Sequence, residues 1–165
     1  SDAEGALFYA NKLIDSGIDP LILARRLIAH TSEDIGMADS NALLLATSAY
    51  FAIQNLGMPE GNLSLSHAII YACEASKSNS VYLAMSKAQE DVKNTKIVTV
   101  PNNLKNHPST NDDGTGAYKY PHDYPNRYVK QQYLPDDLKD RRYYEFGDNK
   151  TENACKLYWK NIKGK

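Results

Sequence analysis

Apolar residues recur every three or four positions along the first part of the chain, and turn-forming residues interrupt this pattern at short intervals. Such spacing is typical of amphipathic helices. Residues such as Asp19-Pro20 mark a helix start, because the aspartate side chain accepts hydrogen bonds from the free amide groups of the first turn and proline has no amide hydrogen that needs a partner. Glycines mark several of the ends. The pattern predicts five consecutive helices, over residues 2–16, 19–35, 40–56, 59–77 and 78–95.

The third of these segments, NALLLATSAYFAIQNL, is apolar around most of its circumference. A helix of this kind must be central in the fold or lie in a subunit interface, because no face of it is suited to water. If it lies in an interface, the candidate contact residues are its large side chains, Leu43, Leu44, Leu45, Tyr50 and Phe51.

The fourth and fifth segments each show one apolar stripe. We expect the fourth helix to bury Leu63, Leu65, Ala68, Ile69 and Ala72, and the fifth to turn Val81, Tyr82, Met85, Ala88 and Val92 inward. Because the connecting loops are short, neighbouring helices should run antiparallel. The predicted fold class is therefore all-α, a bundle or array of about five helices.

After Lys96 the periodicity ends, and the chain becomes rich in turn formers, prolines and tyrosines. We predict an irregular tyrosine-rich C-terminal arm whose aromatic rings lie on the bundle, with one helical turn at residues 134–138 and a short terminal helix at residues 151–162. The domain division follows: residues 1–95 form the helical domain, and residues 96–165 form the arm and terminal helix packed on it.

With 165 residues and 42% hydrophobic residues, the chain can form a core without disulfides or metals. Its two cysteines make no disulfide framework, which favours a reducing, cytoplasmic setting. No apolar run is long enough to span a membrane, and the first residues show no leader signal. Charge is distributed unevenly: residues 1–95 hold six basic and eleven acidic residues, whereas residues 96–165 hold thirteen basic and nine acidic residues.

Motifs for catalysis are missing from the sequence. The nearest string to a phosphate-binding loop is GTGAYK at residues 114–119, which has the wrong spacing and no Ser or Thr after the lysine. Among His30, His67, His107 and His122, we single out His67 with Cys73 as a possible ligand pair, but a spacing of six puts the two on poorly matched faces of a helix, so no metal site is expected. We therefore predict no catalytic, cofactor-binding or metal-binding residues, and no enzyme activity of this chain by itself.

The arm offers a different candidate function. Seven of the twelve tyrosines lie between Tyr118 and Tyr144, among basic residues, and this combination can stack bases and neutralise phosphates. Five acidic residues offset most of those charges, so the arm can equally be a structural clamp. The candidate DNA contacts are Lys119, Arg127, Lys130, Arg141 and Arg142.

Three long strings together resemble a known family: ARRLIAHTSEDIGMAD at residues 24–39, AIIYACEASKSNSVYLA at 68–84, and HDYPNRYVKQQYLPDDLKDRRYYE at 122–145. They are similar to the C-terminal part of the replication-associated recombination protein A family, also called MgsA, which includes the eukaryotic Werner-helicase-interacting protein. The resemblance covers most of the chain, from Ala6 to about Glu145. It does not extend to residues 106–116 or beyond Phe146, and no role is predicted for either stretch.

The resemblance implies a collar like that of clamp-loader subunits. Members of the family are AAA+ ATPases that assemble as homotetramers through this domain and act on DNA at stalled forks, in replication, recombination and repair. The resemblance also implies single-strand-binding protein as a partner, a cytoplasmic, nucleoid-associated location, and no contact with a membrane. ATP and Mg²⁺ would be bound upstream, so no residue here inherits an ATPase role. Two points stay open: the symmetry of assembly, and whether the arm binds DNA, a protein or its own bundle.

Overall fold

The computed structural model describes residues 1–96, 99–107 and 116–164 of the chain. Most of the predicted loop at residues 106–116 therefore lies outside the described residues, as does the start of the GTGAYK string. The described part is helical, with short 3₁₀ turns between residues 102 and 138 and no strand, which confirms the predicted all-α class. Its α-helices are α1 (Ala3–Asp15), α2 (Pro20–His30), α3 (Asn41–Leu56), α4 (Gly61–Glu74), α5 (Ser80–Asn94) and α6 (Lys150–Lys163).

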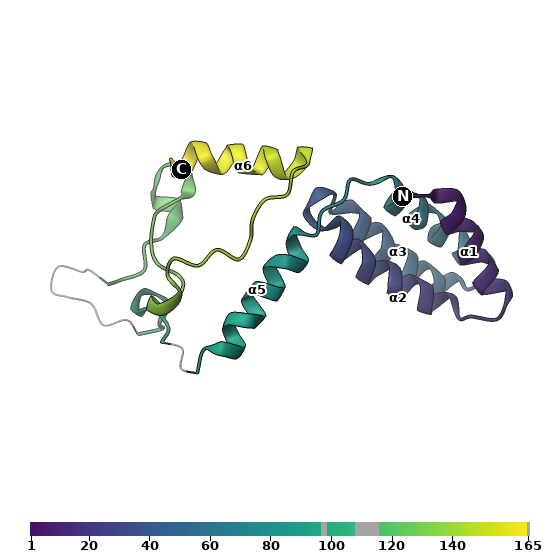
Figure 1. Cartoon of the computed structure of the whole chain (residues 1–165), viewed down its shortest axis with the longest axis horizontal. Coiled ribbons are helices and arrows are strands. Elements are labelled where there is room, and N and C mark those ends of the chain that lie inside the picture. Colours follow the sequence, from purple (N-terminus) through teal and green to yellow (C-terminus); the bar gives the residue numbers. More distant parts are fainter. Residues whose placement is uncertain (97–98, 108–115, 165) are drawn as a thin grey trace. The chain divides into compact units, whose positions relative to one another are not determined.

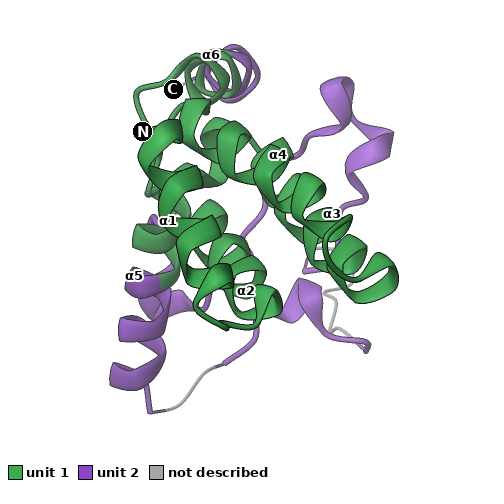
Figure 2. Ribbon diagram, turned by 90° about the vertical axis from the view of Figure 1, so that its right-hand side faces the viewer, with its two compact units in different colours: residues 1–85, 144–157 green, residues 86–143, 158–165 purple. Residues whose placement is uncertain are grey.

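The chain divides into two compact units, each built from separate stretches of sequence (Figure 2). Unit 1 contains residues 1–85 and 144–157, and unit 2 contains residues 86–143 and 158–165. Helices α5 and α6 each begin in unit 1 and end in unit 2. The units are defined by contacts and not by sequence texture, so the division of domains at residue 95 stays a prediction.

The ends of the first helices follow the predicted signals. Asp19 accepts a hydrogen bond of 2.9 Å from the Leu21 amide, and Pro20 occupies the first turn of α2. After His30 the helix widens into a π-helical turn at Thr31–Ile35 and ends at Gly36. Gly36 has a φ of +47°, and a Cβ there would lie 3.1 Å from a Val81 methyl carbon, so both backbone and space favour glycine.

Asp39 stabilises the start of α3 and ties it to α4. Its Oδ1 accepts a bond of 3.1 Å from the Asn41 amide, and its Oδ2 accepts one of 2.8 Å from the Tyr71 hydroxyl. The bond to the carboxylate raises the pKa of Tyr71, because the hydroxyl must keep its proton to donate it. One side chain thus caps one helix and anchors the next.

The core of unit 1 lies between α1, α2, α3 and α4, which pack side by side (Figure 1). Most of its fully buried apolar residues are alanines, and the remainder are isoleucine and leucine: Ala24, Ala38, Ala42, Ala46, Ala49, Ala68, Ala72, Ile35, Ile53, Leu65 and Ile69. Small side chains let the helix backbones approach closely. Gly61 is the extreme case, since a Cβ there would lie 2.9 Å from the Ile53 Cα.

Two expectations about buried faces are wrong. Leu63 is 77% exposed, although the other four residues of the predicted α4 stripe are buried, because the face that meets α3 is narrower than the apolar pattern. On α5, Val81, Tyr82, Met85 and Val92 are all exposed, and Ser80 is the buried residue. The core is therefore formed by four helices, and α5 does not turn its apolar stripe inward.

Replacement of Gly61 by alanine is expected to lower the free energy of unfolding by about 1–3 kcal/mol, the usual cost of overpacking a tight core. The added methyl group would meet backbone atoms of Ile53, which cannot rotate away. Gly5→Ala is the matched control, since only the flexible Asp2 side chain lies near that position and alanine is the better helix former. Urea unfolding of both variants measures the difference. Equal stability of the two would contradict close packing of α3 on α4.

Candidate interaction surfaces

The first candidate surface is the outward face of α3. Its buried positions hold small residues, Ala42, Ala46 and Ala49, followed by Ile53. Its outward positions hold large apolar residues: Leu44 is 63% exposed and Phe51 is 56% exposed, and Leu43 is exposed as well. Small side chains thus occupy most of the buried positions, and several of the largest apolar side chains lie on the exposed side, where polar side chains are usual.

The predicted interface residues therefore fall into two groups. Leu43, Leu44 and Phe51 lie on the surface of unit 1, whereas Leu45 and Tyr50 are half-buried. Tyr50 packs against the core cluster, and its ring meets the Phe51 ring edge to face at a centroid distance of 5.8 Å. The partly buried Tyr50 ring thus contacts the exposed Phe51 ring. Sequence reasoning missed two further exposed side chains, Leu56 at the end of α3 and Leu63 near the start of α4.

The second candidate surface is the set of cations in unit 2. Lys119, Arg127, Lys130, Arg141 and Arg142 are all exposed and all belong to that unit. The Arg141 guanidinium already has a partner, the Asp91 carboxylate at 3.0 Å on α5. Desolvation raises the pKa of the neighbouring Tyr143, and its hydrogen bond to Asp91 adds to the rise. Arg141 therefore has a structural contact as well as an exposed position.

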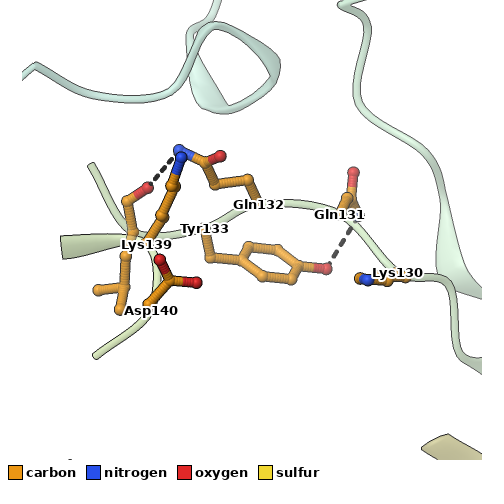
Figure 3. A pocket seen from close by; sticks show the side chains of 7 residues that line it. Lys130, Gln131, Gln132, Tyr133, Lys139 and Asp140 are labelled. Carbon is orange, nitrogen blue, oxygen red and sulfur yellow. Dashed lines mark hydrogen bonds between the residues drawn. The ribbon is translucent and has the colours of Figure 1, made fainter. Parts of the chain in front are cut away.

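Amide side chains hold the irregular backbone of unit 2. Gln131 pairs with the main chain of Lys119: its Oε1 accepts from the amide at 3.0 Å, and its Nε2 donates to the carbonyl at 2.8 Å. Gln132 donates to the Leu134 carbonyl and to Asp136. These bonds replace the ladder bonds that a strand would supply. Gln131 also donates to the Tyr133 hydroxyl, and both line a pocket of about 530 Å³, which Lys130, Lys139 and Asp140 line as well (Figure 3).

Replacement of Gln131 by alanine is expected to raise the hydrogen-exchange rate of the Lys119 amide about fivefold, which corresponds to one lost hydrogen bond of about 1 kcal/mol. Gln132→Ala is the matched control, because its amide bonds to Leu134 and Asp136 and leaves Lys119 untouched. Hydrogen-exchange mass spectrometry measures the exchange rate of the Lys119 amide in both variants. An unchanged rate at Lys119 after loss of Gln131 would refute this pairing.

The best-defined polar site in unit 1 is a buried carboxylate that the sequence did not reveal. Glu152, on the first turn of α6, has no exposed surface. It accepts hydrogen bonds from the Tyr144 hydroxyl at 2.7 Å and from the Asn149 side-chain amide at 2.5 Å. The Ser78 and Ser80 hydroxyls and the Gly147 amide also bond to it. A Cβ on Gly147 would lie 2.6 Å from the carboxylate, so glycine makes this approach possible.

These bonds decide the charge of the site. Burial by itself would raise the pKa of Glu152, but the donors from Ser78, Gly147, Ser80 and Tyr144 outweigh it and lower the pKa to about 2. For Tyr144 the effect is opposite: desolvation and the bond to the carboxylate raise its pKa to about 12. Glu152 is therefore ionised and Tyr144 is neutral at ordinary pH.

The contact joins two distant parts of unit 1. Ser78 and Ser80 lie before and at the start of α5, while Glu152 lies more than seventy residues later, on α6. Thr151 adds a bond of 2.8 Å to the Ala38 carbonyl. One signal in the sequence pointed to the helix start: Asn149 followed by Glu152 has capping-box spacing, and the Asn149 side chain accepts from the Glu152 amide at 3.0 Å. No sequence pattern indicated that this glutamate is buried.

In residues 1–96, 99–107 and 116–164, no three His, Cys, Asp or Glu side chains come together as metal ligands would. In the same residues, no helix is both long and apolar enough to cross a membrane. The described surfaces differ in character: exposed apolar side chains lie on α3, and exposed cations lie in unit 2.

Comparison with known proteins identifies the family of this chain. The model of the family described as MgsA AAA+ ATPase C terminal matches residues 1–163, so the chain has the character of a C-terminal domain of an AAA+ ATPase. The chain belongs to the MgsA AAA+ ATPase C-terminal family. This confirms the family resemblance carried by the three strings and corrects its extent, because the match runs through the loop and past Phe146 to residue 163.

Curated relatives extend from bacteria to a eukaryote. Replication-associated recombination protein A of Bacillus subtilis is 41% identical over 170 residues, covering 100% of this chain and 40% of the relative. The protein of that name from Coxiella burnetii is 40% identical over 148 residues, 87% of this chain and 34% of its own length. ATPase WRNIP1 of Dictyostelium discoideum is 35% identical over 150 residues, 88% of this chain and 17% of the relative. The chain thus spans well under half the length of these relatives.

Proposed function

We propose that this chain is the domain through which copies of an AAA+ ATPase assemble into a homo-oligomer, a tetramer, that works on DNA in replication and recombination. One observation carries the proposal: α3 buries alanines and exposes Leu44 and Phe51. Exposed apolar side chains gathered on one helix are typical of protein interfaces. A stable contact of this kind should bury more than about 1,000 Å² in total.

The rest of the parent protein would supply the chemistry. The chain matches 34% and 40% of the lengths of the Coxiella burnetii and Bacillus subtilis relatives, both of which are named for replication-associated recombination. ATP and Mg²⁺ would be bound by the other part, and linkage of four such modules would raise their effective concentration on one DNA structure. Single-strand-binding protein is a further proposed partner, and the cytoplasmic nucleoid is the proposed location.

A second candidate function, DNA contact by unit 2, is supported by the exposure of Lys119, Arg127, Lys130 and Arg142 together with several tyrosines. The two functions are compatible, because a tetramer would present four copies of this surface. The ion pair of Arg141 with Asp91 counts against Arg141 as a free phosphate contact.

Sedimentation equilibrium of this chain tests the main proposal. We expect a concentration-dependent assembly with a limiting mass of four chains of 18.4 kDa. A strict monomer at tens of micromolar would refute it, since an interface of standard size with a hydrophobic centre should hold at that concentration.

A further inference from the structure

The last turns of α6 carry an exposed aromatic cluster within unit 2. The Trp159 ring meets the Tyr158 ring at a centroid distance of 5.3 Å and the Tyr128 ring at 6.0 Å, both edge to face. Tyr158 is 56% exposed and Trp159 is 37% exposed. Tyr128 comes from the arm, so two segments distant in sequence build one aromatic surface.

The Lys163 side chain lies over two of these rings, Trp159 and Tyr128. The Lys163 ammonium lies 4.4 Å from the centroid of Trp159 and 5.3 Å from that of Tyr128. Such cation–π contacts are weak at exposed sites, because water competes for the ammonium. The indole face is therefore accessible to a ligand that can displace the lysine side chain.

The second half of α6 carries positive charge. No acidic residue follows Glu152 in the sequence, whereas Lys160 and Lys163 lie in the last turns of α6. Arg127 directly precedes Tyr128, is exposed, and has a φ of +50°, a strained backbone for a residue with a side chain. The rings thus lie beside cations that no neighbouring acidic residue of α6 neutralises.

We propose that Tyr128, Tyr158, Trp159, Lys160 and Lys163, here called the Trp159 cluster, form a stacking site for unpaired bases of single-stranded nucleic acid. A base would take the place of the Lys163 side chain on the indole face, and the released ammonium would pair with the adjacent phosphate. Flat aromatic faces flanked by cations are the combination that sequence-independent single-strand binders use. The proposal rests on the second candidate function, DNA contact by unit 2, and gives it a site and a substrate class, whereas it does not depend on assembly through α3.

The tryptophan itself provides the test, because Trp159 is the single tryptophan of the chain. We would titrate the chain with an oligothymidylate of about 15 nucleotides and, separately, with an abasic deoxyribose-phosphate oligomer of the same length. We expect saturable quenching of Trp159 fluorescence by the oligothymidylate and none by the abasic oligomer. With two phosphate contacts, the affinity should fall about sevenfold between 50 and 200 mM salt.

Variants separate stacking from charge. Tyr158→Ala and Trp159→Ala, read by anisotropy of a labelled oligothymidylate, should each bind about tenfold more weakly, as loss of one stacking ring predicts. Lys163→Ala should bind several-fold more weakly and reduce the salt slope by about 0.7. Lys12→Ala, an exposed lysine of α1 in unit 1, removes the same charge and should change nothing. Circular dichroism confirms that each variant is folded.

Three outcomes would overturn the proposal. Equal quenching by the abasic oligomer would mean that contact is electrostatic without stacking. Quenching by anionic phospholipid vesicles but not by oligothymidylate would identify a membrane-surface helix instead. Binding seen by anisotropy without any change in Trp159 fluorescence would place the nucleic acid elsewhere. Sedimentation of the same variants reports the α3-mediated assembly separately, so failure of either idea is recognised on its own.

Discussion

Replacement of Glu152 by alanine is expected to lower the free energy of unfolding of unit 1 by about 3 kcal/mol. The variant would leave the Ser78 and Ser80 hydroxyls, the Gly147 amide and the Tyr144 hydroxyl facing a small cavity without an acceptor. Buried donors that lose a charged acceptor cost more than ordinary hydrogen bonds. Chemical denaturation followed by circular dichroism measures the loss.

The same site predicts how stability depends on pH. The pKa of Glu152 is lowered from 4.5 to about 2 in the folded protein, so its contribution is fully present above pH 4.5 and is lost as the pH falls towards 2. A shift of this size corresponds to about 3 kcal/mol. The pKa of Tyr144 is raised from 10 to about 12, so its contribution is present below pH 10 and is lost as the pH rises towards 12.

Glu152→Gln separates charge from shape. It keeps the volume of the side chain but cannot titrate, and its amide group would face donors. We expect it to be less stable than the natural protein at pH 7 and to lose the acid-dependent component between pH 4.5 and 2. Glu33→Gln, at an exposed position, is the control that should keep that component. If Glu152→Gln kept the full acid dependence, the assigned charge state of Glu152 would be incorrect.

Replacement of Leu44 and Phe51 together by serine is expected to convert the assembled protein into monomers that are still folded. Both side chains are mostly exposed in the single chain, so folding does not depend on them, whereas assembly would bury them. Loss of a leucine and a phenylalanine from an apolar contact should weaken it by at least about 3 kcal/mol, more than a hundredfold in Kd. Sedimentation equilibrium and circular dichroism measure the two effects.

The control for this variant is Val92→Ser, which removes a more exposed apolar side chain from α5. It should leave the mass of the assembly unchanged, since the proposal depends on α3 and not on exposed apolar surface in general. Dissociation by Val92→Ser with no effect of the α3 substitutions would move the interface to α5. A normal assembly of both variants would exclude these residues from the interface.

The sequence predicted the helical fold well because its signals are local. Asp19 and Pro20 start α2 through bonds within one turn, and Gly36 ends the helical run because it adopts a positive φ. The same local reasoning was wrong for α5 and Leu63, since an apolar stripe states which face could be buried and not whether a partner covers it. Periodicity carries no information about that partner.

What the sequence by itself determined is the all-helical class, the helix boundaries, the family, and α3 as the helix with unusual surface. What the tertiary structure decided is which side of α3 faces outward, the four-helix core packed on alanines, and the two sites made by distant segments. Glu152 meets Ser78 and Ser80, and Trp159 meets Tyr128, only because the folded chain brings the start of α5 to the start of α6 and the arm to the last turns of α6. Caps and stripes depend on neighbours in sequence, whereas burial of a charge and clustering of rings depend on neighbours in space.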